Sequence, residues 1–251
     1  MSFATLYDSA WQHPGLAWLG TLPILAWAVT QRVPESKHPA RAPDAQTSQL
    51  ARARLRLLWV LQALIALDAL CTGGLSPLPS PSPWATAAAV FFVIAGDARF
   101  FFLLQDPSLS ATGMGARLLR ALLLSAVLSL AAYVGQQVFP AQLPSSRHLF
   151  LTYELMLLVT TLVLAAWFAR RAPDPAVRCQ RRLTGFVALQ YGLWALADVV
   201  ILSAASWSDL GFALRLVPNA LYYVAFVPFA VRFGTASRVE AAAPSQPRQA
   251  S

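Results

Sequence analysis

The feature that most constrains this chain is a series of long apolar runs with basic residues gathered on one side of them. The chain has 251 residues and only 12% of them are charged, whereas a soluble domain carries about 25%. Runs of about 20 apolar residues separated by short polar segments are typical of transmembrane helices. Of the 19 Lys and Arg residues, 17 lie in segments that fall on one side, and Arg147 and Arg215 are the exceptions. Because Arg- and Lys-rich loops stay in the cytoplasm, the pattern predicts membrane class and orientation together.

The apolar runs predict an all-α membrane protein with seven transmembrane helices, an N-terminus outside and a C-terminus in the cytoplasm of the cell inner membrane. The transmembrane domain covers residues 1–236, and the polar, Pro-containing segment 237–251 is expected to be a disordered cytoplasmic tail. Four prolines within residues 73–84 separate the second helix from the third, because proline cannot continue a helix. The predicted helices cover residues 15–31, 57–75, 84–104, 118–138, 148–169, 183–204 and 210–233.

The formal net charge of +8 does not indicate nucleic-acid binding, because the basic residues lie in loops and are not interleaved with aromatic residues. The lipid bilayer is the expected partner, with anionic headgroups attracting the basic loops. The two cysteines, Cys71 and Cys179, fall on opposite sides of the predicted topology and cannot form a disulfide or a metal site. No catalytic signature is present, so the sequence predicts no metal, no cofactor and no clear enzymatic activity.

Weak internal similarity suggests a duplication. Three pairs of segments match in the same order, with offsets of about 140, 130 and 131 residues. Leu- and Ala-rich helices produce single matches by chance, but three matches in register favour a parallel 3+1+3 repeat with the fourth helix as a linker. The paired segments are 21–32 with 161–171, the surroundings of Asp68 with those of Asp198, and 89–95 with 220–226.

Two acidic residues inside apolar runs, Asp68 and Asp198, are made equivalent by this repeat. Charged groups within the membrane are costly and are often functional. Tyr191, Trp194 and Asp198 follow i, i+3, i+7 spacing and share one helix face, and Tyr223 adds a hydroxyl group from the seventh helix. We therefore expect a cavity that binds a cation, a proton or a polar solute. The alternative is structural, with each carboxylate hydrogen bonded to a helix neighbour beside packed aromatic rings.

Four further charged residues lie within predicted helices. Glu154 and Arg215 each lie about one turn inside the outer face, where they either form an ion pair that closes an external mouth or remain separate at the headgroups. Asp97 and Arg99, in the sequence GDARFFF, lie in the inner half of the third helix. Arg99 can extend to the cytoplasmic headgroups, and Asp97 can pair with it or with a neighbouring helix, which favours a structural anchor or an inner gate.

Two families share parts of this pattern. The seven helices and the outward N-terminus resemble microbial rhodopsins, whose retinal is bound to a lysine of the seventh helix, but the single lysine here is Lys37, in a cytoplasmic loop. The proposed 3+1+3 repeat resembles SWEET transporters and nicotinamide riboside carriers. Residues 193–200, LWALADVV, are similar to the sixth-helix region of the riboside carriers. That resemblance implies that aromatic and polar side chains of this helix face a substrate, although the Pro-Gln motifs of SWEET proteins are missing.

The sequence as a whole favours an inner-membrane protein that binds or transports a small polar solute through a central cavity. A second interpretation is a non-transporting sensor or accessory subunit, whose helices pack against protein partners. A third is an intramembrane enzyme that modifies lipids.

Overall fold

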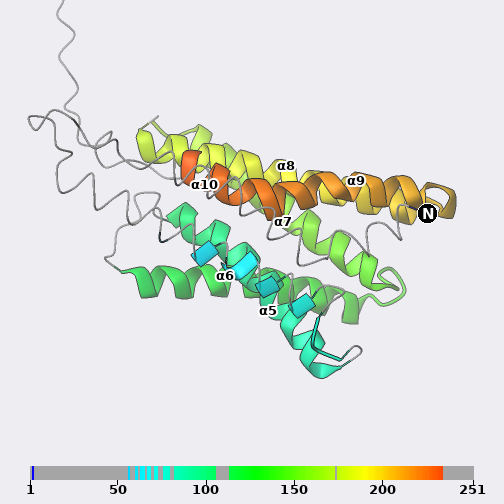
Figure 1. Ribbon diagram of the computed structural model, residues 1–251. Helices are drawn as coiled ribbons and strands as arrows, with labels where there is room; N and C mark the ends of the chain where they lie inside the picture. Colours follow the sequence, from blue (N-terminus) through cyan, green and yellow to red (C-terminus); the bar gives the residue numbers. More distant parts are fainter. Residues whose placement is uncertain are drawn as a thin grey trace, which may run out of the picture.

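The computed structural model (Figure 1) describes residues 82–105, 113–172 and 174–233 continuously, together with Ser2 and individual residues between positions 56 and 79. The continuous ranges are helical apart from short connections, and they contain no strand. The helices are α5 (Pro83–Gln105), α6 (Met114–Val138), α7 (Ser146–Ala169), α8 (Pro175–Ser203), a 3-10 turn η3 (Ala205–Trp207), α9 (Ser208–Ala220), a π-helical turn η4 (Leu221–Ala225) and α10 (Phe226–Phe233).

Five helical segments are long and apolar enough to cross a membrane, and the last of them is the continuous rod from η3 through α9 and η4 into α10. In lipid, a helix satisfies its backbone hydrogen bonds internally, which is why such segments span bilayers. In length and composition these five helical segments fit a multi-pass membrane protein. Of the two other predicted spans, 15–31 lies outside the described residues and 57–75 lies only partly within them, so a total of seven spans stays a prediction.

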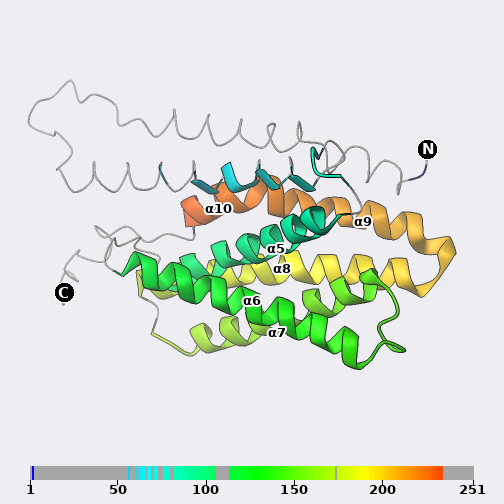
Figure 2. The same cartoon turned by 90° about the horizontal axis from the view of Figure 1, so that it is seen from below.

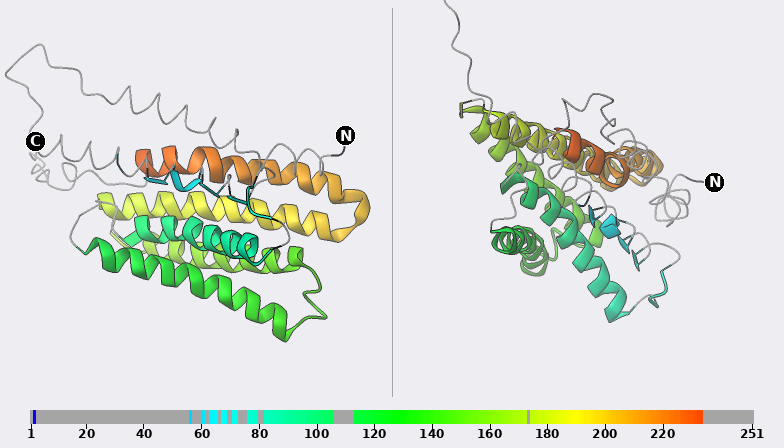
Figure 3. Two further views of the ribbon diagram at one scale, coloured as in Figure 1. Left: turned by 60° about the horizontal axis from the view of Figure 1, so that its bottom comes forward. Right: turned by 60° about the vertical axis from the view of Figure 1, so that its left-hand side comes forward.

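The helices run in alternating directions, and α5 is inclined to its neighbours (Figures 2 and 3). Helix α8 lies between α7 and the rod of α9 and α10, and α5 also contacts α8. Helix α6 packs against α5 and α7 at the edge of this group. The arrangement places α8 where it can offer side chains to several neighbours at once.

The core contains at least one fully buried apolar side chain from each of several segments. Ile65, Leu103, Leu157, Leu183 and Val227 all belong to one buried cluster. Packing of this kind stabilises helix association in lipid, where the hydrophobic effect between helices is weak. The membership of Ile65 shows that the segment before α5 packs against the same core.

Helix α6 presents most of its surface away from the protein. Its buried residues are Ala121, Ser125 and Ala132, all small, and small residues let helix backbones approach closely in membranes. The Ser125 hydroxyl donates a hydrogen bond to the carbonyl oxygen of Ile94 on α5, at 2.8 Å. The large exposed apolar side chains of α6, such as Leu123 and Val127, suit contact with lipid tails.

Helix α8 begins eight residues before the start at 183 that the apolar pattern predicts, so Arg178, Cys179 and their basic neighbours lie in a helix and not in a loop. Asp174 is the N-cap, and its carboxylate accepts a hydrogen bond from the Val177 backbone N–H at 2.7 Å. Pro175 occupies the first helical position, which suits its fixed φ angle. An Asp-Pro pair before a helical run is a start signal that hydropathy alone overlooks.

The last span is one rod, but its hydrogen bonding changes along its length. Pro218 lies inside α9 and has no N–H to donate to the preceding turn. The π-helical turn η4 follows, and the Phe226 N–H donates to the Leu221 carbonyl oxygen five residues earlier. Such turns are rare and often occur at functional sites. This one carries Tyr222 and Tyr223.

Arginines cluster at one end of the bundle. The alternating directions bring the starts of α6 and α8 to the same end as the last turns of α7 and α10 (Figure 2). These helix ends and their flanks carry Arg117, Arg120, Arg170, Arg171, Arg178, Arg181, Arg182 and Arg232.

Candidate functional site

A cavity of about 300 Å³ lies among α5, α7, α8, the α9–η4 rod and the segment that carries Asp68. This volume is at the lower end of the range for small-molecule sites, which are usually about 300–1,000 Å³. Part of the wall is apolar and comes from Ala89, Phe92, Val93 and Phe150. The polar and aromatic part of the wall consists of Asp68, Thr72, Asp97, Tyr153, Glu154, Tyr191, Trp194, Arg215, Asn219, Tyr222 and Tyr223.

Asp97 of α5 is held by two tyrosines from different helices. The Tyr153 hydroxyl of α7 donates to Oδ2, and the Tyr191 hydroxyl of α8 donates to Oδ1. The two rings lie 6.5 Å apart and nearly perpendicular. Because a buried carboxylate without donors would be very costly, these hydrogen bonds explain how Asp97 is accommodated at 5% exposure. They also join α5, α7 and α8 at the cavity wall.

Arg99 is buried within the protein and does not extend to the headgroups as the sequence suggested. The residue is 5% exposed, and its Nε donates a hydrogen bond to the Gly96 carbonyl oxygen at 3.0 Å. The guanidinium lies 4.6 Å from the centre of the Tyr222 ring and 5.2 Å from that of Phe226, within the range of cation–π attraction. Asp97 bonds to the neighbouring helices, which is one of the two pairings that the sequence left open.

The approach of α5 to the π-helical turn requires a glycine. A Cβ atom at Gly96 would meet the Tyr222 hydroxyl and ring. Without that atom, the Tyr222 ring fits against α5 beneath Arg99. Gly96 therefore allows the Tyr222 side chain of η4 to lie against α5.

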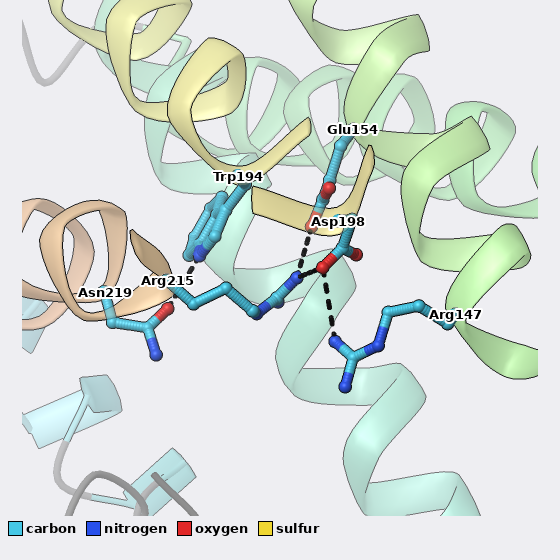
Figure 4. Close-up of polar contacts among 6 residues, drawn as sticks. All are labelled: Arg147, Glu154, Trp194, Asp198, Arg215 and Asn219. Carbon is cyan, nitrogen blue, oxygen red and sulfur yellow. Dashed lines mark hydrogen bonds and ion pairs between the residues drawn. The ribbon is translucent and has the colours of Figure 1, made fainter. Parts of the chain in front are cut away.

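Near the end of the bundle opposite the arginine-rich end, four charged residues form what we call the ionic cluster: Arg147, Glu154, Asp198 and Arg215 (Figure 4). Arg215 Nη1 contacts Asp198 Oδ1 and lies 3.3 Å from Glu154 Oε1. Arg147 Nη1 lies 3.4 Å from Asp198 Oδ1, with its side chain 27% exposed. The ion pair between Glu154 and Arg215, one of the two arrangements considered from the sequence, is present; a role in closing a mouth stays a prediction.

Each carboxylate of this cluster keeps one oxygen without a hydrogen-bond partner among the described residues. These atoms are Glu154 Oε2 and Asp198 Oδ2, and both are buried. Such atoms are uncommon and call for an explanation. Glu154 lines the cavity, whereas the lining residues do not include Asp198.

Asp68 reaches the cavity from the segment before α5. The Thr72 hydroxyl donates to Oδ1 at 2.9 Å, and the Tyr223 hydroxyl of η4 donates to Oδ2 at 3.2 Å. Nearby, Trp194 Nε1 of α8 donates to Asn219 Oδ1 of α9 at 2.6 Å, which is shown in Figure 4. The hydrogen bonds made by Tyr223 and Asn219 connect the last rod to its neighbours at the cavity wall.

The structure thus brings together most residues that the sequence singled out. Asp68, Tyr191, Trp194 and Tyr223 line the cavity, as do Asp97, Glu154 and Arg215. Asp198 is placed one turn beyond Trp194 on α8 and contacts Arg215 instead of the cavity. That these residues bind a ligand stays a prediction.

Sequence reasoning missed three residues that complete the site. Tyr153 follows no motif, although it precedes Glu154 in an apolar run. Asn219 follows Pro218, and an uncharged polar residue within an apolar helix is the signal that could have found it. For Arg147, the sequence predicted only the side of the membrane on which it lies. The near-equivalence of Asp68 and Asp198 is untested, because most of the first half of the repeat lies outside the described residues.

Within the described part of the chain, no three His, Cys, Asp or Glu side chains lie close enough together to hold a metal ion. Comparisons with models of protein families, with curated proteins and with solved structures found no match for this chain. The resemblance to 3+1+3 carriers therefore remains an expectation from the sequence.

Proposed function

We propose that this protein binds a small polar solute in its central cavity and carries it across the cell inner membrane. The observation that supports this most directly is the cavity wall, which combines Asp68, Asp97 and Glu154 with several aromatic side chains in an otherwise apolar helix group. Charged groups at membrane depth mark solute and ion pathways in many membrane proteins. Replacing buried charged groups with well-packed apolar side chains is often neutral or stabilising, so stability alone does not account for these residues.

The arginine-rich end supports an orientation for the proposed carrier. Because Lys and Arg favour the cytoplasmic side, we place that end in the cytoplasm, with the C-terminus inside and the ionic cluster toward the outer side. In this orientation Arg215 lies between the cavity and the outer solution, where its contacts with Glu154 and Asp198 would open and close an external entrance. Pro218 and η4, in the rod that carries Arg215, are where such a rod bends most easily.

The test is uptake and ligand-induced thermal stabilisation of the purified full chain. A panel of small polar metabolites is first screened for compounds that raise the Tm of the protein. We expect Asp68→Asn to reduce the affinity for the active compound at least 10-fold and to reduce its uptake into proteoliposomes equally, because Asp68 lines the cavity. Asp209→Asn is the matched control, since Asp209 is an exposed carboxylate in the first turn of α9.

Other outcomes favour the alternative functions. Binding without uptake would indicate a sensor, and a stoichiometric protein partner in native mass spectra of the gently extracted protein would indicate an accessory subunit. If no compound of the panel stabilises a well-folded protein, the proposal is wrong.

A further inference from the structure

We propose that the solute is a small organic cation with a single positive charge, whose ammonium group lies between Asp68 and Asp97 against the aromatic wall. This inference rests on the proposed function and specifies its substrate class. Four observations carry it: the charge balance of the buried groups, the aromatic surface, an unused acceptor at Glu154 and the absence of a metal-type cluster in the described ranges.

Counted with every group ionised, the charged residues described around the cavity carry one net negative charge. Around the cavity and the ionic cluster, the described residues supply four carboxylates and three guanidinium groups, all buried except the partly exposed Arg147. Isolated charges are expensive in a low-dielectric interior, so a bound ligand with one positive charge would restore neutrality. The groups counted are Asp68, Asp97, Glu154, Asp198, Arg99, Arg147 and Arg215.

Among the described residues, the two carboxylates of this set that form no ion pair are Asp68 and Asp97 on the cavity wall, and the single Arg99 guanidinium acts electrostatically on both. Asp68 accepts hydrogen bonds from Thr72 and Tyr223, and Asp97 accepts them from two other tyrosines. Hydroxyl donors satisfy oxygen atoms but carry no positive charge. In the described residues, the arginine side chains that form ion pairs do so with the carboxylates of the ionic cluster, so the remaining negative charge lies with Asp68 and Asp97.

The aromatic side chains form a continuous surface around this side. Tyr191 and Trp194 have ring centres 5.3 Å apart, Trp194 and Tyr222 5.5 Å, and Tyr222 and Tyr223 4.9 Å. Aromatic faces attract organic cations, with Trp the strongest, and the attraction grows when water is excluded. The position of Arg99 over the Tyr222 ring shows that these rings already accept one cation.

Glu154 adds a further acceptor to the cavity wall. It is 4% exposed, lines the cavity, and its Oε2 has no hydrogen-bond partner among the described residues. A ligand that carries a hydroxyl or amide N–H away from its ammonium group would satisfy this atom. A bare metal ion fits less well, since no three metal-type ligands lie together in the part of the chain that is described.

Three ring compounds of similar size and different charge test the inference: benzylamine, protonated at pH 7, benzyl alcohol and benzoate. Binding to the purified full chain in detergent is measured by calorimetry. We expect benzylamine to bind at least 10-fold more tightly than benzyl alcohol and benzoate to bind weakest. Asp68→Asn should remove the preference for benzylamine while leaving the affinity for benzyl alcohol unchanged, and Asp209→Asn should change neither.

A second variant tests whether the probes bind in the cavity. Ala89→Trp fills space at the wall and should weaken binding of every probe that occupies the cavity, independently of charge. Benzylamine binding that survives Ala89→Trp, or equal affinities for the three probes, overturns the inference. If benzyl alcohol binds as tightly as benzylamine and both are lost in Ala89→Trp, the cation class is wrong and the proposed function stands. If no probe and no metabolite of the panel binds, both proposals fail.

Discussion

Removal of the Arg215 side chain is the sharpest test of how the buried charges stabilise the protein. The variant Arg215→Met keeps most of the side-chain volume but leaves Asp198 and Glu154, whose side chains are 0% and 5% exposed, without this guanidinium. Breaking a buried ion pair by removing one partner costs about 3–5 kcal/mol. Arg147, whose Nη1 lies 3.4 Å from Asp198 Oδ1, compensates part of the loss. We therefore expect the free energy of unfolding to fall by the lower end of this range, about 3 kcal/mol.

The assay is thermal unfolding of the purified protein in detergent. For a chain of this size, about 1 kcal/mol lowers the Tm by about 2–4 °C, so Arg215→Met should lower it by about 6–12 °C. Arg147→Met is the matched control, because a partly exposed ion pair contributes only about 0–1 kcal/mol, a shift of a few degrees at most. Neutralising the partners as well, in the triple variant with Glu154→Gln and Asp198→Asn, should recover most of the lost stability. Equal Tm shifts for the two arginine variants, or a triple variant less stable than Arg215→Met, would refute the reasoning.

Two further stability predictions use matched pairs. Gly96→Ala should destabilise the protein by about 1–3 kcal/mol, because the added methyl group meets Tyr222. Gly135→Ala is the control: a Cβ there meets nothing within 4 Å, so this variant should be neutral or stabilising by up to about 1 kcal/mol. A Tm for Gly96→Ala at or above that of Gly135→Ala would contradict the observed approach of η4 to α5. Tyr191→Phe removes a hydrogen-bond donor to the buried carboxylate of Asp97 and should lower the free energy of unfolding by about 1.5–3 kcal/mol. Tyr133→Phe changes an exposed ring and should leave the Tm unchanged. Equal Tm values for the two variants would show that the hydroxyl of Tyr191 does not stabilise the protein.

Much of the architecture could be predicted because membrane helices are specified locally. A bilayer requires about 20 apolar residues per helix, and five such segments are present in the described ranges. The position of a residue along its helix also follows from counting, at about 1.5 Å per residue. This is why the sequence could suggest that Glu154 and Arg215 lie at a similar depth, where the structure shows an ion pair.

The start of α8 was predicted wrongly for a physical reason that is also local. Hydropathy marks where a helix enters the apolar region, but α8 begins about two turns before that point. The Asp174 cap and Pro175 stabilise those turns through hydrogen bonding and a fixed φ angle, neither of which hydropathy measures. Capping signals would have placed the basic residues of this segment on a helix.

What the sequence by itself determined is the apolar, helical character of the described part of the chain, the approximate extent of its spans and the position of each charged residue along its helix. What only the tertiary structure decided is which charges meet. Helices that are apolar on all sides carry no amphipathic stripe to indicate which face turns inward, so the rotation of each helix depends on packing with its neighbours. That rotation directs Asp97 to Tyr153 and Tyr191, places Asp198 beside Arg215, and leaves Asp68 on the cavity wall.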